Sequence, residues 1–527
     1  MRDLHIPGRS PVYSTHGMAA TSMPAATLTA VDVLRAGGNA MDAAVAAAAV
    51  LAVIEPQSTG IGGDCFCLYK PRGKPVIALN GSGRAAAGYS IDWFERHGID
   101  AISETSAHAV TIPGAVGAWE ALLTAHGTRG LDTLLQPAIA FAADGWPVHQ
   151  RVAFDWALCT AKLRANGADT FLPAPQPGEI FTQTALANTL RAIAAGGARA
   201  FYEGPVAAGI VATLRARGGQ QTEADFAAGR TAAEFVTPIH AAFRGYDVWQ
   251  CPPNGSGLLV LMLLGILGGF APADDPLGAQ RLHRHIEAAR LVYRDRDAFL
   301  ADPAQSDVPV ARLTDPAYLA SLRALIDPAR AMAHLPAVAE SMLPPHRDTV
   351  YLCVVDRDGN VCSFINSLFE PFGTGIVDAA SGVMLQNRGF GFRVQRGHPN
   401  CIAPNKRPLH TIIPGMLTKG NDAIMPFGVM GGHFQPMGQT LLLSNILEYG
   451  MDPQAAIDLP RLFPYAGRVE VERGIPAATL AALTRMGHTM HAIEKPHGGG
   501  QAIWIDHARG TLTGGSDPRK DGMALGY

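Results

Sequence analysis

The sequence predicts a folded protein of the α+β class. Its 527 residues are 48% hydrophobic and 17% charged, a balance typical of a packed core and opposite to that of disordered chains. Helical patterns dominate over the first 55 residues and from about 115 to 330, whereas the texture after 349 is strand-rich with many glycines. The change of composition at 344–349 is therefore the best internal boundary.

Several classes of protein are disfavoured by charge and composition. The formal net charge is −3, which gives no electrostatic footprint for nucleic acid or an anionic membrane. The seven cysteines are odd in number and sparse, so a disulfide framework is not expected. The N-terminus has no apolar signal segment, and the longest apolar run, 257–270, is shorter than the ~20 residues of a membrane span. We therefore expect a cytoplasmic protein with neither a membrane nor a nucleic-acid partner.

The helices begin and end at recognisable residues. Pro24 suits the first turn of a helix over 24–36, and Gly37 ends it. Asn39 caps a second, alanine-rich helix that ends before Pro56. The apolar run at 257–270 is interpreted as a buried helix.

A glycine-rich turn, "TGIGGD", follows the first helices. Its spacing differs from G-x-G-x-x-G and it leads into a strand, so nucleotide binding is disfavoured. Cys65 and Cys67 come next, and we interpret them as neighbours on one face of that strand. No second ligand pair follows at a usable spacing, so neither a metal nor a cofactor is expected.

A hairpin is predicted from 349–355 and 361–367, because both runs are rich in β-branched and aromatic residues. Asp358–Gly359 between them suits a tight turn. With that two-residue turn, Val350 faces Ser367, so Ser367 lies beside Thr349 at the open end. On this pattern alone, the two hydroxyls merely cap the strand ends.

The chain resembles the γ-glutamyltransferase family of N-terminal-nucleophile hydrolases, in motifs that occur in order over nearly its whole length. The segments that carry the resemblance are "GGNAMDAAVAAAAVLAVIEPQSTGIGGD", "VTIPGAVGAWE", "LLQPAIAFAADGW", "PPNGSGLLVLMLLGIL", "AARLVYRDRDAFLADP", "DTVYLCVVDRDGN", "FGTGIVDAASGVML", "NKRPLHTIIPGM", "GVMGG" and "GGSDPRKDGMALGY".

This resemblance implies a four-layer αββα sandwich in which two subunits, 1–348 and 349–527, form one intertwined domain. It also implies that the precursor cuts its own backbone between Asp348 and Thr349. A hydroxyl is a weak nucleophile and needs a base beside it. Cleavage would supply one, because an unperturbed α-amino group has a pKa of about 7.7–8.0.

Other catalytic roles are also implied by the resemblance. Ser367 stands where the family places a threonine that hydrogen-bonds the nucleophile. Gly431 and Gly432 match a glycine pair whose backbone N–H groups form the oxyanion hole. Without the resemblance, this pair would be interpreted as an ordinary turn.

The sequence departs from the family in the acyl pocket. Family members that act on γ-glutamyl groups hold the α-carboxylate with an arginine, a serine pair and an asparagine, and the α-ammonium with a carboxylate. The residues at these positions here are Ser82, His410, Thr411, Phe369 and Gly391, with Arg84 and Arg388 close by in the sequence.

The predicted pocket has an excess of positive charge. The anion for a substrate ammonium is gone, while Arg388 and Arg84 supply positive charge, and Phe369 adds bulk. An arginine fork suits a carboxylate. We therefore expect a substrate with a carboxylate next to an amide and without an α-amino group. The alternative is that Arg84 or Arg388 pairs with a structural carboxylate such as Asp64.

The predicted function is hydrolysis of a small amide through an acyl-threonine intermediate. Within the family, the variants "GSGR", "NRGF" and "RPLHTIIPG" resemble members that convert oxamate to oxalate and ammonia. One alternative is a γ-glutamyl hydrolase or transferase, or an acylase for dicarboxylic amides such as glutaryl groups. Another is an unprocessed, non-catalytic binding protein. The expected partners are the small-molecule amide and the two subunits, as a heterodimer or a dimer of heterodimers.

Overall fold

The capping residues near the N-terminus begin and end helices as predicted. α1 (Pro24–Arg35) begins on a proline, and α2 (Ala40–Ile54) begins after Asn39. The Asn39 side chain accepts hydrogen bonds from the backbone N–H groups of Met41 and Asp42, and the Asp42 carboxylate accepts one from the Asn39 N–H. This capping box satisfies N–H groups that have no partner within the helix. Every residue of α2 is buried, so its small side chains let it pack closely against its neighbours.

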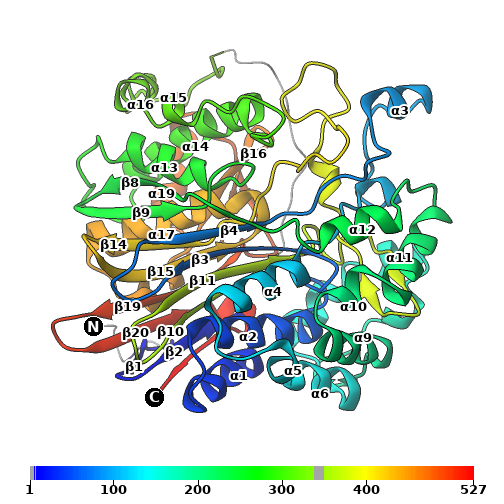
Figure 1. Cartoon of the computed structure of the whole chain (residues 1–527). Helices are drawn as coiled ribbons and strands as arrows, with labels where there is room; N and C mark the ends of the chain where they lie inside the picture. Colours follow the sequence, from blue (N-terminus) through cyan, green and yellow to red (C-terminus); the bar gives the residue numbers. More distant parts are fainter. Residues whose placement is uncertain (1–4, 6–7, 337–348) are drawn as a thin grey trace.

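Two large sheets form the centre of the computed structural model, which describes residues 5, 8–336 and 349–527 (Figure 1). Among these residues, sheet A has the strand order β1 (Val12–Ser14), β20 (Thr511–Ser516), β19 (Gly499–Asp506), β15 (Asp422–Met430), β14 (Gly415–Lys419), β9 (Tyr246–Gln250) and β8 (Ile239–Phe243). Sheet B has the order β21 (Met523–Gly526), β2 (Met18–Thr21), β10 (Val350–Val355), β11 (Val361–Ser367), β3 (Asp64–Lys70), β4 (Ile77–Gly81) and β7 (Glu234–Val236).

Helices cover the outer face of each sheet (Figure 1). Sheet B is covered by α1, α2 and α4 (Ala115–His126), with α5 (Leu131–Leu134), α6 (Gln136–Asp144) and α9 (Thr184–Gly196) packed beyond them. Sheet A is covered by α13 (Gly257–Leu267), α17 (Gln435–Tyr449) and α18 (Pro453–Asp458), with α14 (Ala279–Phe299), α16 (Pro316–Arg323) and α19 (Ala477–Arg485) beside them.

Shorter elements complete the described chain. The remaining helices are α3 (Ile91–Arg96), α7 (Gln150–Ala157), α8 (Thr160–Ala165), α10 (Arg199–Tyr202), α11 (Pro205–Arg215), α12 (Glu223–Gly229) and α15 (Val310–Leu313). The small sheets contain β5 (Trp146–Pro147) with β6 (Ile180–Phe181), β12 (Val377–Asp378) with β13 (Val383–Met384), and β16 (Leu462–Tyr465), β17 (Arg468–Val471) and β18 (Met490–Ala492).

A separate apolar core fills the space between the two sheets. Tyr351 and Phe66 enter it from sheet B, and Met416 and Ile503 enter it from sheet A. Each sheet also has one further core, which lies between it and the helices that cover it. The order helix, sheet, sheet, helix confirms the predicted four-layer αββα sandwich.

The hairpin of β10 and β11 forms, but the predicted register is wrong by one residue. Val350 pairs with Asn366 rather than with Ser367. The connection is longer than the expected two-residue turn, and Gly359 within it has φ +81°. A three-residue loop with a left-handed glycine shifts the pairing by one position. Thr349 therefore lies directly opposite Ser367, rather than diagonal to it.

Each of the two sheets contains strands from both sides of the predicted cut. In sheet B, β2 lies between β21 and β10, and β11 lies beside β3. In sheet A, β1 and β9 flank the block formed by β20, β19, β15 and β14. The segments before residue 337 and after residue 348 therefore share both sheets and the three apolar cores named above.

The middle segment contains one hairpin that the pattern did not predict and one helix that it did. β8 and β9 form a hairpin at 239–250, within a region whose pattern predicted mostly helix. Most of the run at 257–270 forms the expected buried helix, α13, which ends at Leu267. Within the parts of the chain that the structure describes, no helix has both the length and the apolarity needed to cross a membrane.

Candidate active site

Thr349 and Ser367 meet at the open end of the hairpin. Side chains alternate across a strand, and Tyr351 of β10 and Ile365 of β11 both face the core between the sheets. Thr349 and Ser367 lie two residues away from them, on the same side. Their hydroxyl oxygens are 3.1 Å apart, and both side chains are fully buried. The structure thus brings together the two hydroxyls that the hairpin predicted to be neighbours.

The other contacts of Ser367 determine the direction of this hydrogen bond. Ser367 Oγ accepts from the Phe369 N–H at 3.0 Å and from Arg388 Nη2 at 3.3 Å. A serine oxygen has two lone pairs and one proton, so its O–H remains to be donated. The partner in reach is Thr349 Oγ1. A bond donated to Oγ1 stabilises negative charge there and leaves the threonine proton free to pass to a base.

Arg388 places a positive charge beside the hydroxyl pair. It begins the 3-10 helix Arg388–Gly391, and its side chain is fully buried. Nη1 donates to Thr411 Oγ1 at 2.9 Å, while Nη2 donates to Ser367 Oγ. The guanidinium carbon lies 4.1 Å from the centre of the Phe369 ring, a cation–π contact. Three of the predicted site residues, Ser367, Thr411 and Phe369, therefore surround the guanidinium of a fourth.

The charge of Arg388 is not balanced by an ion pair with any described residue. In the described parts of the chain, no carboxylate lies at ion-pair distance from it, and its Nε is buried without a hydrogen-bond partner. Burial lowers the pKa of Arg388 to about 9, and the charges of Asp64 and Glu370 offset part of this effect. The guanidinium is still charged at neutral pH. A buried cation held by two neutral hydroxyls is a favourable partner for an anionic ligand group.

Phe369 has a backbone conformation that is rare for a bulky residue, with φ +85°. Its N–H is fixed by Ser367 Oγ, and its ring is buried under the Arg388 guanidinium. Such conformations persist where the surroundings hold them, and they cluster at functional sites. The role of Phe369 in the acyl pocket stays a prediction.

Gly431 and Gly432 form a sharp turn between β15 and α17. Their φ angles are +116° and +56°, in the region that favours glycine. A Cβ at Gly431 would lie 2.9 Å from Gly498 Cα. The next residue, His433, places its ring 6.4 Å from that of Phe369, so the turn lies beside the Arg388 pocket. The oxyanion role of this glycine pair stays a prediction.

His410 is oriented by Asp64, which the sequence did not single out as a site residue. His410 Nε2 lies 3.0 Å from Asp64 Oδ2, and both side chains are fully buried. Asp64 stands opposite Ser367 in the pairing of β3 with β11. His410 was predicted to contact the substrate, whereas the structure shows this contact with Asp64. The spacing of the two residues in the sequence could not have revealed the pair.

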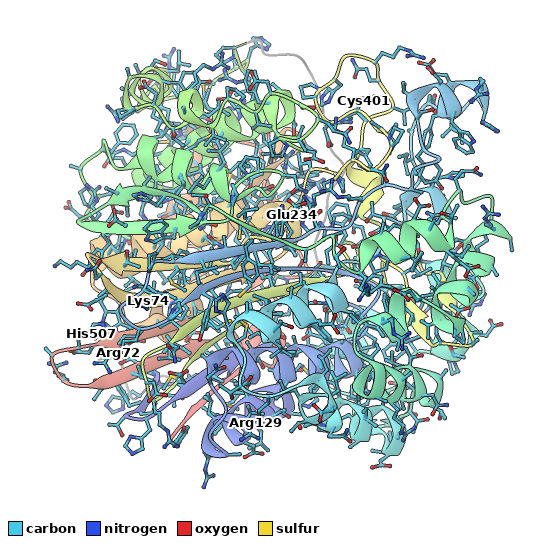
Figure 2. The ribbon with its side chains drawn as sticks, in the orientation of Figure 1. Arg72, Lys74, Arg129, Glu234, Cys401 and His507 are labelled. Carbon is cyan, nitrogen blue, oxygen red and sulfur yellow. The ribbon has the colours of Figure 1, made fainter. Side chains whose placement is uncertain are left out.

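Arg84 is engaged away from the hydroxyl pair. Its Nη2 donates to Glu234 at 2.8 Å, its Nη1 donates to the Asn405 carbonyl, and Asp302 lies 3.8 Å away. Glu234, labelled in Figure 2, is a half-exposed residue of the edge strand β7. The structure therefore supports a structural ion pair for Arg84, the alternative considered with its predicted substrate contact. The carboxylates are Glu234 and Asp302 rather than Asp64.

The bond predicted to be cut lies at the edge of the described chain. Thr349 is described, whereas Asp348 lies outside the described residues, so its role stays a prediction. Two neighbours of the site had no signal in the sequence analysis. Glu370 follows Phe369 and is buried, and His433 accepts a hydrogen bond from Arg296 through Nδ1.

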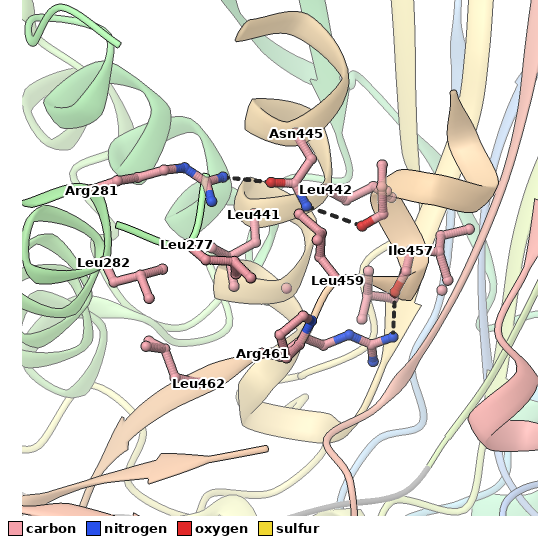
Figure 3. A pocket seen from close by; sticks show the side chains of 15 residues that line it. Leu277, Arg281, Leu282, Leu441, Leu442, Asn445, Ile457, Leu459, Arg461 and Leu462 are labelled. Atoms are coloured by element: carbon pink, nitrogen blue, oxygen red, sulfur yellow. Dashed lines mark hydrogen bonds between the residues drawn. The ribbon is translucent and has the colours of Figure 1, made fainter. Parts of the chain in front are cut away.

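The cavity in Figure 3 lies in another part of the molecule, between α14, α17 and β16. Leucines line much of it, and Arg281 donates to Asn445 at its edge. Its free volume of about 20 Å³ has room for about one water molecule, so it is not a substrate site. Across the described residues, no group of histidine, cysteine, aspartate and glutamate side chains is arranged to hold a metal ion.

Comparisons with known proteins agree with this geometry. The family described as gamma-glutamyltranspeptidase matches residues 26–527. The glutathione hydrolase-like YwrD proenzyme of Bacillus subtilis is 38% identical over 521 residues, covering 94% of this chain and 95% of that protein. The oxamate amidohydrolase proenzyme of Klebsiella pneumoniae is 34% identical over 537 residues, covering 98% and 99%. The crystal structure of a cephalosporin acylase from Bacillus halodurans is similar with a TM-score of 0.93 at 38% identity, covering 100% of this chain and 98% of that one.

Proposed function

The chain belongs to the gamma-glutamyltranspeptidase family, and from this premise we propose that it hydrolyses small amides whose acyl group carries a carboxylate. It is a self-processing N-terminal-nucleophile hydrolase, an enzyme that acts on amides, and its two subunits come from one precursor. The observation that carries the proposal is the buried Arg388 guanidinium, which contacts two hydroxyls and lies beside the nucleophile.

The reaction begins once the backbone is cut before Thr349. The new α-amino group takes the proton of Thr349 Oγ1 as this oxygen attacks the amide carbon. Ser367 stabilises the charge on Oγ1, and the N–H groups of Gly431 and Gly432 receive the oxyanion. The C–N bond then breaks, and ammonia or an amine leaves with the proton. Water attacks the resulting ester by the same route, which releases the acid and restores the threonine.

The substrate carboxylate pairs with Arg388. This guanidinium hydrogen-bonds Ser367, which in turn hydrogen-bonds Thr349, so carboxylate and attacked carbon lie close together. Short acyl groups satisfy this geometry best, and oxamate, in which the two carbons are adjacent, is the first candidate. Phe369 occupies space that a longer acyl chain would need.

A second candidate is hydrolysis of γ-glutamyl amides. Glu370 is buried, and its charge acts on Arg388, so a carboxylate that could accept an α-ammonium lies in the same region. This candidate also agrees with the glutathione hydrolase-like relative. An acyl group of the glutaryl type has a carboxylate but no α-ammonium, so it needs only the contact with Arg388.

The proposal is tested with a panel of amides and two variants. Oxamate, glutaryl-p-nitroanilide and γ-glutamyl-p-nitroanilide are supplied to the purified protein, and release of ammonia or nitroaniline is measured. Intact mass of the native chain and of Thr349→Ala shows processing: two fragments from the first and one chain from the second. Turnover of oxamate or the glutaryl amide that is lost in Arg388→Met, with processing retained, supports the proposal. Preference for the γ-glutamyl amide supports the second candidate, whereas an uncut native chain supports a non-catalytic binding protein.

A further inference from the structure

Asp64 receives an unusual set of hydrogen bonds for a buried carboxylate. Oδ1 accepts from the backbone N–H groups of Gly83 at 2.9 Å and Gly114 at 3.1 Å, and from Gln386 Nε2 at 2.8 Å. Oδ2 faces His410 Nε2 at 3.0 Å. The side chain is fully buried at the start of β3. Four segments that are distant in the sequence thus converge on one carboxylate.

The backbone around Asp64 is packed so closely that it admits only glycine at two positions. A Cβ at Gly83 would lie 1.9 Å from the carbonyl oxygen of Ile112, and one at Gly114 would lie 2.0 Å from that of Gly81. These main-chain atoms cannot move aside as a flexible side chain can. The two backbone donors to Asp64, from Gly83 and Gly114, are therefore held in place by their surroundings.

His410 and Gln386, two of the hydrogen-bond partners of Asp64, are close in sequence to residues of the acyl pocket. His410 is followed by Thr411, whose hydroxyl accepts from Arg388 Nη1 at 2.9 Å. Gln386 precedes Arg388 by two residues. Ser367, which accepts from Arg388 Nη2, is the cross-strand partner of Asp64. Of the two described hydrogen-bond partners of the guanidinium, Ser367 is thus the cross-strand partner of Asp64, and Thr411 is the chain neighbour of His410, which contacts Asp64.

We propose that Asp64 is a positioning residue, which acts through His410 and Gln386 to aim the Arg388 guanidinium at the carboxylate of the substrate. The inference rests on the proposed function, because it assigns a role in recognising the acyl group. Asp64 also supplies a negative charge near Arg388, whose guanidinium forms no ion pair with a described carboxylate. An uncharged residue of the same shape would keep much of the fold but lose this charge and one of the two acceptor oxygens.

Asp64→Asn tests the role, with Asp42→Asn as the matched control. Asp42 is equally buried, and its carboxylate also accepts four hydrogen bonds, from the backbone of Asn39 and Arg129 and from the backbone and hydroxyl of Thr128. Asp42 lies near the turn that joins β10 to β11, at the opposite end of the hairpin from Thr349. This position follows from the backbone N–H of Ala40, in the same helix turn, which donates to Asp356. A general cost of removing a buried carboxylate should therefore appear in both variants.

The readout is KM and kcat for the carboxylate amide that the native enzyme hydrolyses fastest, measured on fully processed protein. In Asp64→Asn we expect KM to rise roughly 10- to 100-fold while kcat falls much less, a loss of the size found when a residue that orients a metal ligand is removed. Asp42→Asn should leave both constants near their native values. Equal effects of the two variants on KM would overturn the proposal.

A second pair of variants leaves Asp64 in place, in case Asp64→Asn does not fold. His410→Ala removes the donor to Oδ2, whereas His410→Gln can keep an N–H near the position of Nε2. We expect the alanine variant to raise KM as Asp64→Asn does, and the glutamine variant to recover part of it. Native KM in His410→Ala would contradict the role. If the native enzyme hydrolyses no carboxylate amide at all, the proposed function fails, a result distinct from unchanged KM in an active enzyme.

Discussion

The Ser367 hydroxyl shows how much one residue can contribute through the direction of its hydrogen bonds. It accepts from Phe369 and Arg388, so its proton goes to Thr349 Oγ1. Ser367→Ala removes that donor and leaves two buried donors without an acceptor. We expect kcat to fall about 100-fold, as on loss of one donor to a developing anion. Ser367→Thr keeps the hydroxyl and should retain most of the activity. Single-turnover kinetics would separate the chemical step from binding, and equal rates in the alanine and threonine variants would contradict this assignment.

Arg388 predicts the pH dependence of the free enzyme. The α-amino base of Thr349 must be unprotonated, so kcat/KM should rise with pH through about 7.7–8.0, the pKa of an unperturbed α-amino group. Arg388 must be protonated, and burial lowers its pKa to about 9, so kcat/KM should fall above that value. Arg388→Lys should move the alkaline limb to lower pH, because a buried lysine loses its proton more easily. A profile whose alkaline limb is the same in both enzymes would show that this residue does not bind the substrate.

The residues of the site were predictable to different degrees. The pairing of Thr349 with Ser367 followed from a hairpin, which is local in sequence, and Arg388 followed from a position that departs from the family pattern. Asp64 and His410 are 346 residues apart, and only the tertiary fold brings them together. Arg84 had the right charge for a substrate contact, but its partner Glu234 lies on an edge strand that the sequence analysis did not assign.

At the scale of elements, turn length decides the register of a hairpin. Asp358–Gly359 correctly marked the turn, yet the same dipeptide fits two- and three-residue loops, which place the strands one residue apart. Helix ends were better defined, because Asn39 and Pro24 act within a single turn of backbone. The sequence pattern did not identify the β8–β9 hairpin, because its strands are short and partly exposed.

The two sheets are held close together at Gly428 of β15. A Cβ there would lie 2.4 Å from the Tyr351 ring, and Tyr351 cannot easily turn away because its hydroxyl binds Ser363 at 2.9 Å. Gly428→Ala should therefore push β10 and β15 apart and lower the free energy of unfolding by about 1–3 kcal/mol. Because Tyr351 is two residues from Thr349, processing should also slow.

Gly60→Ala is the matched control, since its Cβ would meet Leu368 at 3.6 Å, an ordinary contact. Thermal melting and the time course of the two-fragment pattern measure the two effects. The interpretation fails if Gly428→Ala melts and matures as Gly60→Ala does.

At the scale of the whole molecule, a buried ionic cluster joins the two predicted subunits. Asp155 of α7 pairs with Arg151 at 2.9 Å, and it lies 3.0 Å from Lys495 and 3.6 Å from Lys520, both beyond the predicted cut. Asp155→Ala leaves these cations without their shared carboxylate. We expect a loss of stability of about 3–5 kcal/mol, typical of removing one partner from a buried ionic group.

The exposed pair of Asp92 with Arg396 provides the contrast. Asp92→Ala should leave the melting temperature unchanged, because ion pairs in water contribute little. Denaturation of the processed enzyme, followed by circular dichroism, measures both variants. Equal melting temperatures for the two would show that the Asp155 cluster does not stabilise the assembly.

The presence in each sheet of strands from both sides of the cut has a consequence for reversibility. Before cleavage, folding is a first-order process, because every strand of both sheets belongs to one chain. After cleavage, the same sheets can be rebuilt only when two separate polypeptides meet, so refolding becomes second-order and its yield should rise with protein concentration. The uncut Thr349→Ala chain should refold equally well at any dilution. Maturation is therefore hard to reverse. The cut creates the catalyst, and it also removes the covalent link that allows the unfolded precursor to refold as a single chain.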